Sequence, residues 1–219
     1  MDAHPAAAQI VAAGRRLGSR GLISAGEGNI SVRLDGGRLA ITPTGRRKDE
    51  LTEDDVVVVV TGHAERDARS ASGLGPSSDL AIHLALHAAR PDIGAVAHAH
   101  LPASMALTLG GEVPDPGSLP ETAHLIPRMP FVPFGEMGSD ELAARIAAAL
   151  TEGPEPLPNV AMLERHGAVA VGPDAATAVD RLELVEVLCR AWRDGLLVRA
   201  ARATLGPDRS RGPGAGPTR

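Results

Sequence analysis

The sequence predicts an α/β protein in which helices cover one partly antiparallel sheet. Two observations support this fold class. Segments with helical spacing of apolar residues interleave with short strand-like runs along the 219 residues, which is typical of a sheet covered by helices. Asp35-Gly36-Gly37 lies between two such runs and is a strong hairpin signal, so at least two strands are expected to be antiparallel.

Each element follows from the spacing of its apolar residues. Ile10, Leu17 and several alanines share one face of the first predicted helix, and residues 56–60 form an unbroken β-branched run, as expected of a buried strand. The predicted elements, in chain order, are a helix over 6–19, strands over 30–34, 38–42 and 56–60, a surface loop over 62–76, a helix over 80–90, a strand over 95–100, a short helix near 103–109, a helix over 139–151, a strand pair within 160–171 and a long helix over 175–198.

Length and composition indicate one globular domain. A chain of 219 residues is long enough for one substantial domain, to which we assign residues 1–205. Residues 206–219 are dominated by Gly, Pro, Arg and Ser and predict a disordered tail. The hydrophobic share of 43% and the charged share of 22% are ordinary for a soluble protein. The net charge of −5, without a basic stripe in the body of the chain, argues against general nucleic-acid binding.

Cysteine content and the lack of long apolar runs predict a cytoplasmic protein. A single cysteine, Cys189, excludes an internal disulfide and fits a reducing compartment. The first 20 residues lack the continuous apolar core of a signal peptide, and no run approaches the length of a membrane span. We therefore expect no membrane partner.

The stretch Ala95-Val96-Ala97-His98-Ala99-His100 is the most informative part of the chain. An apolar run enters it, so it predicts a buried strand that ends in two histidines. Side chains on a strand alternate between faces, so His98 and His100 are expected to point the same way, within reach of one divalent ion. Pairs of this kind also arise by chance, so the metal-site hypothesis needs support from elsewhere in the chain.

A catalytic zinc typically takes three protein ligands and keeps one position open. The best candidate for the third ligand is His166, in the segment Met162-Leu163-Glu164-Arg165-His166-Gly167. Imidazole suits zinc, and manganese or cobalt are alternatives that the residue types leave open.

Three further segments combine glycine with small hydrogen-bond donors: Gly28-Asn29, Thr44-Gly45 and Ser77-Ser78. Glycine lets backbone N–H groups approach an anion, and serines at a helix N-terminus add hydroxyl donors to the helix dipole. Together they suit a phosphate monoester. Each segment alone is better explained as ordinary turn chemistry.

Taken in order, these motifs resemble the class II aldolase/adducin family. The resemblance rests on five motifs, Gly28-Asn29-Ile30-Ser31, Thr42-Pro43-Thr44-Gly45, Pro76-Ser77-Ser78-Asp79, His98-Ala99-His100 and His166-Gly167, and it covers residues 5–200. Within the family the sequence is most similar to the L-fuculose-1-phosphate aldolases, with the L-ribulose-5-phosphate 4-epimerases as close relatives. The resemblance implies a single three-layer αβα domain and a homotetramer with active sites at the subunit boundaries.

The resemblance also implies a role for each motif. It implies a zinc ion held by His98, His100 and His166. It implies that Gly28, Asn29, Thr44, Gly45, Ser77 and Ser78 hold the phosphate of a sugar-phosphate substrate, and that Asp79 is the catalytic base. In the family's chemistry the metal polarises a ketose phosphate, a carbon–carbon bond breaks, and the metal stabilises the enediolate.

The sequence departs from the family pattern at two points. The aldolases have glutamate where this chain has Asp79, which is one methylene shorter and is the residue that the epimerases carry. Both branches use tyrosines, and this chain has none. A proton for the departing aldehyde must therefore come from another group, for which we propose His124 or water.

The function predicted is a zinc-dependent aldolase, a carbon–carbon lyase that cleaves a small, L-fuculose-1-phosphate-like ketose phosphate to dihydroxyacetone phosphate and an aldehyde. The alternatives on the same scaffold are a sugar-phosphate 4-epimerase and a sugar-acid-phosphate decarboxylase. A non-catalytic, adducin-like interaction module is a further alternative, disfavoured because the three histidines are retained.

Two other histidines form a rival metal-site hypothesis. His83 and His87 follow Asp79 by four and eight residues and share one helix face with it. For His83 we favour a role beside the site or in packing, and for His87 a surface position.

Overall fold

A seven-stranded sheet forms the centre of the protein, in a computed structural model that describes residues 2–205. The strand order is β3-β2-β1-β4-β7-β6-β5, and neighbours are antiparallel except for β5 and β6, which are parallel. The strands are β1 (Asn29–Leu34), β2 (Arg38–Ile41), β3 (Val57–Val60), β4 (Ala95–Ala99), β5 (Phe131–Val132), β6 (Val160–Leu163) and β7 (Gly167–Gly172).

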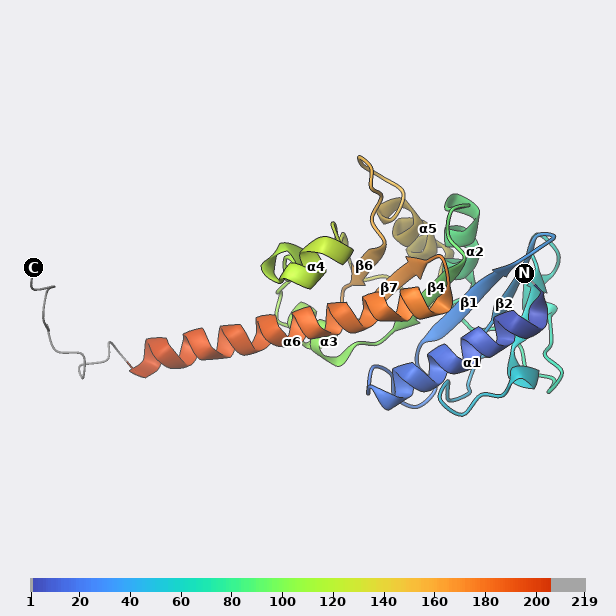
Figure 1. Cartoon of the computed structure of the whole chain (residues 1–219), viewed down its shortest axis with the longest axis horizontal. Coiled ribbons are helices and arrows are strands. Elements are labelled where there is room, and N and C mark those ends of the chain that lie inside the picture. Colours follow the sequence, from blue (N-terminus) through green and yellow to red (C-terminus); the bar gives the residue numbers. More distant parts are fainter. Residues whose placement is uncertain (1, 206–219) are drawn as a thin grey trace, which may run out of the picture.

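Helices cover both faces of this sheet, which confirms the predicted three layers (Figure 1). The helices α1, α3 and α6 pack on one face, while α2 and α5 pack together on the other. The α-helices are α1 (Ala3–Ser19), α2 (Leu80–Ala89), α3 (Pro102–Leu109), α4 (Pro120–Leu125), α5 (Asp140–Ala149) and α6 (Ala175–Leu205), and short 3₁₀ turns span Glu53–Asp55, Glu65–Asp67 and Pro116–Ser118. Among the described residues, no helix is long and apolar enough to cross a membrane.

The central strands β1 and β4 carry different side chains on their two faces. Toward α1 and α6, β1 presents Ile30, Val32 and Leu34, and β4 presents three alanines, all within one apolar cluster. Toward α2, β1 presents Asn29 and Ser31 instead. The functional residues described below therefore lie on the α2 side of the sheet.

The predicted elements are confirmed, with differences at their ends. The longest helix, α6, continues to Leu205 and extends away from the sheet (Figure 1). Two elements between residues 110 and 138, a proline-rich connection, were not predicted, namely α4 and the two-residue strand β5. Both are too short to show a period of their own. The predicted tail, residues 206–219, lies outside the described residues.

Candidate active site

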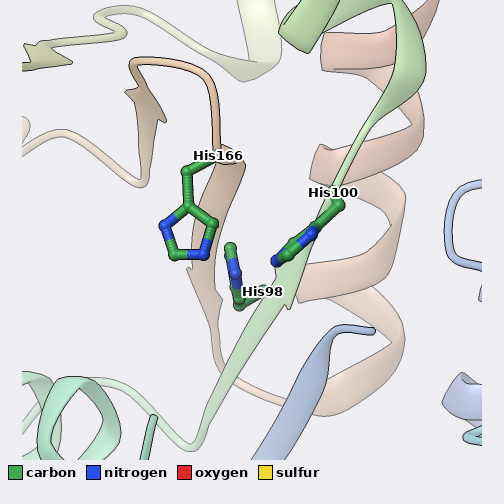
Figure 2. A group of neighbouring side chains, drawn as sticks. All are labelled: His98, His100 and His166. Carbon is green, nitrogen blue, oxygen red and sulfur yellow. The ribbon is translucent and has the colours of Figure 1, made fainter. Parts of the chain in front are cut away.

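Three histidines converge at the end of the central strand (Figure 2). His98 belongs to β4, His100 follows its last residue, and His166 lies in the turn between β6 and β7. Their ring centroids are 4.7–5.0 Å apart. The potential ligand atoms all lie within 4.8 Å of one another, so the structure brings together all three predicted ligands.

Strand pairing and two glycines position this triad. Strands β4 and β7 are neighbours, with Ala99 opposite Ala168, so the turn that carries His166 ends beside His100. Gly167 has φ +94°, and a Cβ there would collide with the backbone at the end of β4. Gly28, with φ +72°, lies close to the other side of β4, where a Cβ would be 2.8 Å from the His98 carbonyl oxygen. The backbone can therefore close around the histidines only with glycine at these positions.

The hydrogen bonds of His98 leave its second ring nitrogen available as a ligand. Its Nδ1 donates to the Ala168 carbonyl oxygen at 3.0 Å, so the lone pair is on Nε2. The Nε2 atoms of His98 and His166 are buried and have no hydrogen-bond partner in the described chain. Burial, and then the neighbouring histidines, lower the pKa of both residues, so the imidazoles are neutral. Neutral imidazoles whose ring nitrogens have no hydrogen-bond partner are suited to bind a divalent cation.

A cavity of about 330 Å³ opens beside His100. It brings together Asp79 and all six residues predicted to hold phosphate. Its lining residues are Gly26, Glu27, Gly28, Asn29, Thr44, Gly45, Lys48, Ser77, Ser78, Asp79, His100 and Met137. Loops far apart in the sequence meet here because Pro43 and Pro76 form an isolated β-bridge and Ser77 N–H donates to the Thr42 carbonyl.

Asp79 is buried, and only one of its carboxylate oxygens has a partner. Oδ2 accepts a hydrogen bond from the Asn29 side-chain amide at 2.8 Å. Oδ1 is buried without a hydrogen-bond partner among the described residues. Because Asn29 uses one of its two side-chain N–H groups on Asp79, one side-chain N–H remains for a ligand.

A line of hydrogen bonds between β1 and α2 fixes the orientation of Asn29. The Asn29 oxygen can only accept, so His83 donates to it from Nε2 at 2.6 Å. His83 Nδ1 must then accept from the Ser31 hydroxyl at 2.7 Å, and Ser31 in turn accepts from His87 Nε2 at 2.9 Å. Every donor in this line points toward Asp79, so the line holds Asn29 with its amide group facing the carboxylate.

The prediction that His87 lies at the surface is wrong. Its side chain is only 4% exposed, because it packs between α2 and β1 and bonds to Ser31. Burial lowers the pKa of His83 to about 4 and, with the charges of His83 and Arg33, that of His87 to about 3. The role beside the site that we favoured for His83 agrees with its hydrogen bonds. In residues 2–205 the only group of three or more potential ligand residues close enough to hold a metal is the triad of His98, His100 and His166.

Glu27 lines the cavity, whereas His124 does not. Glu27, which could repel a phosphate, is directed partly toward His100, with 3.6 Å between its Oε1 and the His100 Nδ1. His124, predicted as an acid, is exposed on α4 and is absent from the cavity lining of this single chain. Its role stays a prediction.

Lys48, a buried cation in the cavity wall, is not among the site residues predicted from the sequence. The sequence does contain a feature that singles this residue out: Lys48 is the only lysine in a chain whose other fixed positive charges are arginines.

Comparison with known proteins identifies the family. Residues 8–193 match the class II aldolase and adducin N-terminal domain. The chain is 33% identical over 190 residues to the methylthioribulose-1-phosphate dehydratase of Gluconacetobacter diazotrophicus, covering 82% of this chain and 88% of that protein. It is 29% identical over 181 residues to the 3-oxo-tetronate 4-phosphate decarboxylase of Haemophilus influenzae, covering 81% of each.

A solved structure agrees with these matches. The L-fuculose-1-phosphate aldolase of Thermus thermophilus superposes with a TM-score of 0.73 at 26% identity, covering 89% of this chain and 96% of that one.

The chain therefore belongs to the class II aldolase and adducin family. Its relatives are enzymes whose names include an aldolase, a dehydratase and a decarboxylase. The family is generally metal-dependent, which agrees with the histidine triad. Family members act on sugar phosphates and are typically oligomeric.

Proposed function

We propose that this protein is a metal-dependent lyase that cleaves a small ketose phosphate into dihydroxyacetone phosphate and an aldehyde. The observation that supports this best is the position of Asp79. It lines a cavity that also contains His100 and the predicted phosphate donors, and its Oδ1 has no partner in the described chain. A carboxylate with one oxygen held and the other unpartnered is suited to move a proton at a substrate carbon.

Each part of the chain has a separate task in this reaction. Backbone N–H groups and side-chain donors around Gly28, Thr44 and Ser77 bind the phosphate and orient the ketose. His98, His100 and His166 would hold a divalent cation, which would supply Lewis-acid chemistry to the reaction. Asp79 exchanges a proton at the carbon beside the ketone. During cleavage one proton leaves the hydroxyl of the aldehyde half and one is delivered to the dihydroxyacetone phosphate half, so the reaction balances without an added reactant.

Zinc is the metal we propose, because three imidazole nitrogens and an open position suit a catalytic zinc; manganese and cobalt are the alternatives. We also propose a homotetramer, by analogy with the family. Metal analysis of the purified protein and sedimentation velocity test these two proposals separately.

The test of the function starts with half of the reaction. Metal-loaded protein is incubated with dihydroxyacetone phosphate in heavy water, and the hydroxymethyl proton signal is followed by NMR, with chelator-treated protein as the control. Metal-dependent loss of the signal is expected. The absence of exchange in fully metallated protein would count against aldol cleavage.

A second candidate is elimination of water from a ketose 1-phosphate. The relative named as a methylthioribulose-1-phosphate dehydratase favours it, as does the absence of tyrosine, because the aldolases and the 4-epimerases that the sequence resembles both use tyrosine. Product analysis separates the two reactions. Cleavage yields dihydroxyacetone phosphate, whereas elimination yields one dicarbonyl product with the carbon chain intact.

His124 is our candidate for the proton transfer at the aldehyde half. It would accept the hydroxyl proton during cleavage and act as the acid expected from the sequence only in the reverse reaction, in which the aldehyde oxygen receives a proton. It is exposed on α4, so it could act only on substrate that reaches beyond the cavity described above. Turnover of His124→Ala is expected to fall relative to the unchanged chain. Equal turnover would assign this proton to water.

A further inference from the structure

The cavity beside the triad contains one fixed-position cation, Lys48. The sequence has 22 lysines and arginines together, and Lys48 is the single lysine among them. Its side chain is among the largest fully buried ones, with 2% of the residue exposed, and it lines the cavity together with the predicted phosphate donors. No other residue in that lining is a lysine or arginine.

The ammonium group of Lys48 is held by two backbone carbonyls. Nζ donates to the carbonyl oxygens of Gly26 and Arg46, at 2.7 Å each. Gly26 precedes the Gly28-Asn29 loop and Arg46 follows Thr44-Gly45, so Lys48 lies between two of the predicted phosphate-binding loops. An ammonium has three N–H donors, so one remains after these two bonds.

The charge of Lys48 is not neutralised by a close carboxylate. In the part of the chain that the structure describes, its hydrogen bonds go to carbonyl oxygens alone. Burial lowers its pKa to about 8, and the negative charge of Asp79 opposes this effect only in part. Buried lysines are rare in proteins unless they are paired, so an anion is the missing partner.

We propose that Lys48 is the cationic ligand of the substrate's phosphate group, and that its remaining N–H donates to a phosphate oxygen in the cavity. This rests on the proposed function, in which the cavity receives a phosphorylated ketose. The other donors of the cavity are neutral, and Glu27 adds a negative charge to its wall. Lys48 therefore supplies the positive charge that a phosphate dianion requires, and a compact ammonium can serve two carbonyls and a phosphate at once.

The single lysine makes a direct test possible. The full chain is produced with lysine labelled with ¹³C at the ε-carbon, so the spectrum contains one side-chain lysine resonance. Inorganic phosphate is titrated at constant ionic strength against zinc-loaded and chelator-treated protein, with sodium chloride as the control. We expect phosphate to shift this resonance in a saturable way in both forms, and to move its titration midpoint to higher pH. A resonance that does not move up to saturating phosphate would overturn the proposal, as would an absence of phosphate binding by calorimetry.

Variants separate anion binding from a purely structural role. Lys48→Met keeps the length of the side chain and removes its charge, and should weaken phosphate binding about 10- to 100-fold, the effect of losing a charge-assisted hydrogen bond. Lys48→Arg should retain part of the affinity. Arg47→Met is the matched control, because Arg47 is exposed, pairs with Asp49 and Glu50, and does not line the cavity. Phosphate affinity equal to that of the unchanged chain in Lys48→Met would overturn the proposal. If Lys48→Met fails to fold, the NMR titration of the unchanged chain decides.

These measurements do not depend on turnover. Phosphate binding that shifts the Lys48 resonance in a protein without lyase activity would contradict the proposed reaction and leave the role of Lys48 supported. Turnover of ketose phosphates with an unmoved Lys48 resonance would do the reverse.

Discussion

The two faces of strands β1 and β4 differ sharply in chemistry although one stretch of backbone carries both. Toward α1 and α6, the side chains are aliphatic and form part of the largest apolar cluster. Toward α2, the same strands carry Asn29, Ser31 and His98, each of them hydrogen-bonded to a neighbouring element. Since successive residues on a strand alternate between faces, one short segment supplies both core and site.

The two faces of the sheet contribute to the free energy of folding in different ways. On the apolar face, stability comes from area removed from water, at about 25 cal/mol per Å². On the α2 face, polar groups are buried, and each must be matched by a partner or by a bound ion. Substitutions on the α2 face should therefore change activity, metal binding or the pH dependence of stability, whereas those on the apolar face should change stability alone.

The largest effect on activity is expected from Asp79→Asn. The amide cannot accept a proton from carbon, so turnover and proton exchange should fall by about 10²- to 10⁴-fold, the usual contribution of a general base. Steady-state kinetics and the exchange experiment measure this loss, while metal analysis serves as the control. Metal content should stay the same, because Asp79 lies outside the histidine triad. Turnover close to that of the unchanged chain would remove Asp79 from the mechanism.

The second prediction concerns the metal. Removing a residue that only orients a ligand costs about 10- to 100-fold in metal affinity, so removing a ligand itself, as in His98→Ala, should cost at least about 100-fold. Competition with a chromogenic chelator measures the affinity. The matched control is His63→Ala, an exposed histidine in the loop after β3, which should bind metal like the unchanged chain. Equal affinity in both variants would show that the triad does not hold the metal.

The third prediction uses the neutral histidines on the α2 face. The pKa of His87 is about 3 in the folded chain, against an ordinary value of 6.5. As the pH falls from 6.5 toward 3, the unfolded chain therefore binds a proton that the folded chain does not, and the free energy of unfolding decreases by about 1.4 kcal/mol per pH unit for this group.

His87→Leu should make this pH dependence shallower by about that amount. Denaturant unfolding of chelator-treated protein between pH 4.5 and 6.5 measures the slope, and His63→Leu, at an exposed position, is the control. Identical slopes for the two variants would mean that His87 is not buried in a neutral form.

Much of the fold and the metal triad could be predicted from the sequence, because their signals are local. Because side chains on a strand alternate between faces, the spacing of His98 and His100 directly predicts that they share a face. The turn motif Asp35-Gly36-Gly37 predicts, from only three residues, that the two flanking strands pair. The third ligand, His166, was a candidate from the sequence, but its role was implied only by the family resemblance, because it lies in the turn between β6 and β7, far along the chain from β4. The structure brings all three together.

What the sequence analysis missed depends on contacts between distant segments. The burial of His87 follows from its bond to Ser31, 56 residues earlier in the chain. Lys48 is buried because the loops around Gly26 and Arg46 close over it. Helical spacing alone cannot distinguish a histidine that faces solvent from one that faces a polar strand, and single-residue counts reveal a rare lysine without showing what surrounds it.

The smallest effect is expected on the apolar face. Ile30 stands between Asn29 and Ser31 in the sequence, but its side chain lies on the opposite face of the sheet. It is fully buried there, in the large apolar cluster. Ile30→Val removes one methylene group and should lower the free energy of unfolding by about 0.5–1.5 kcal/mol. Denaturant unfolding measures this change, with Val198→Ala, an exposed position on α6, as the control. Metal affinity and turnover should match those of the unchanged chain, because the substitution leaves the hydrogen bonds of the α2 face in place. A fall in the turnover of fully folded Ile30→Val protein would show that the two faces are coupled through the strand backbone.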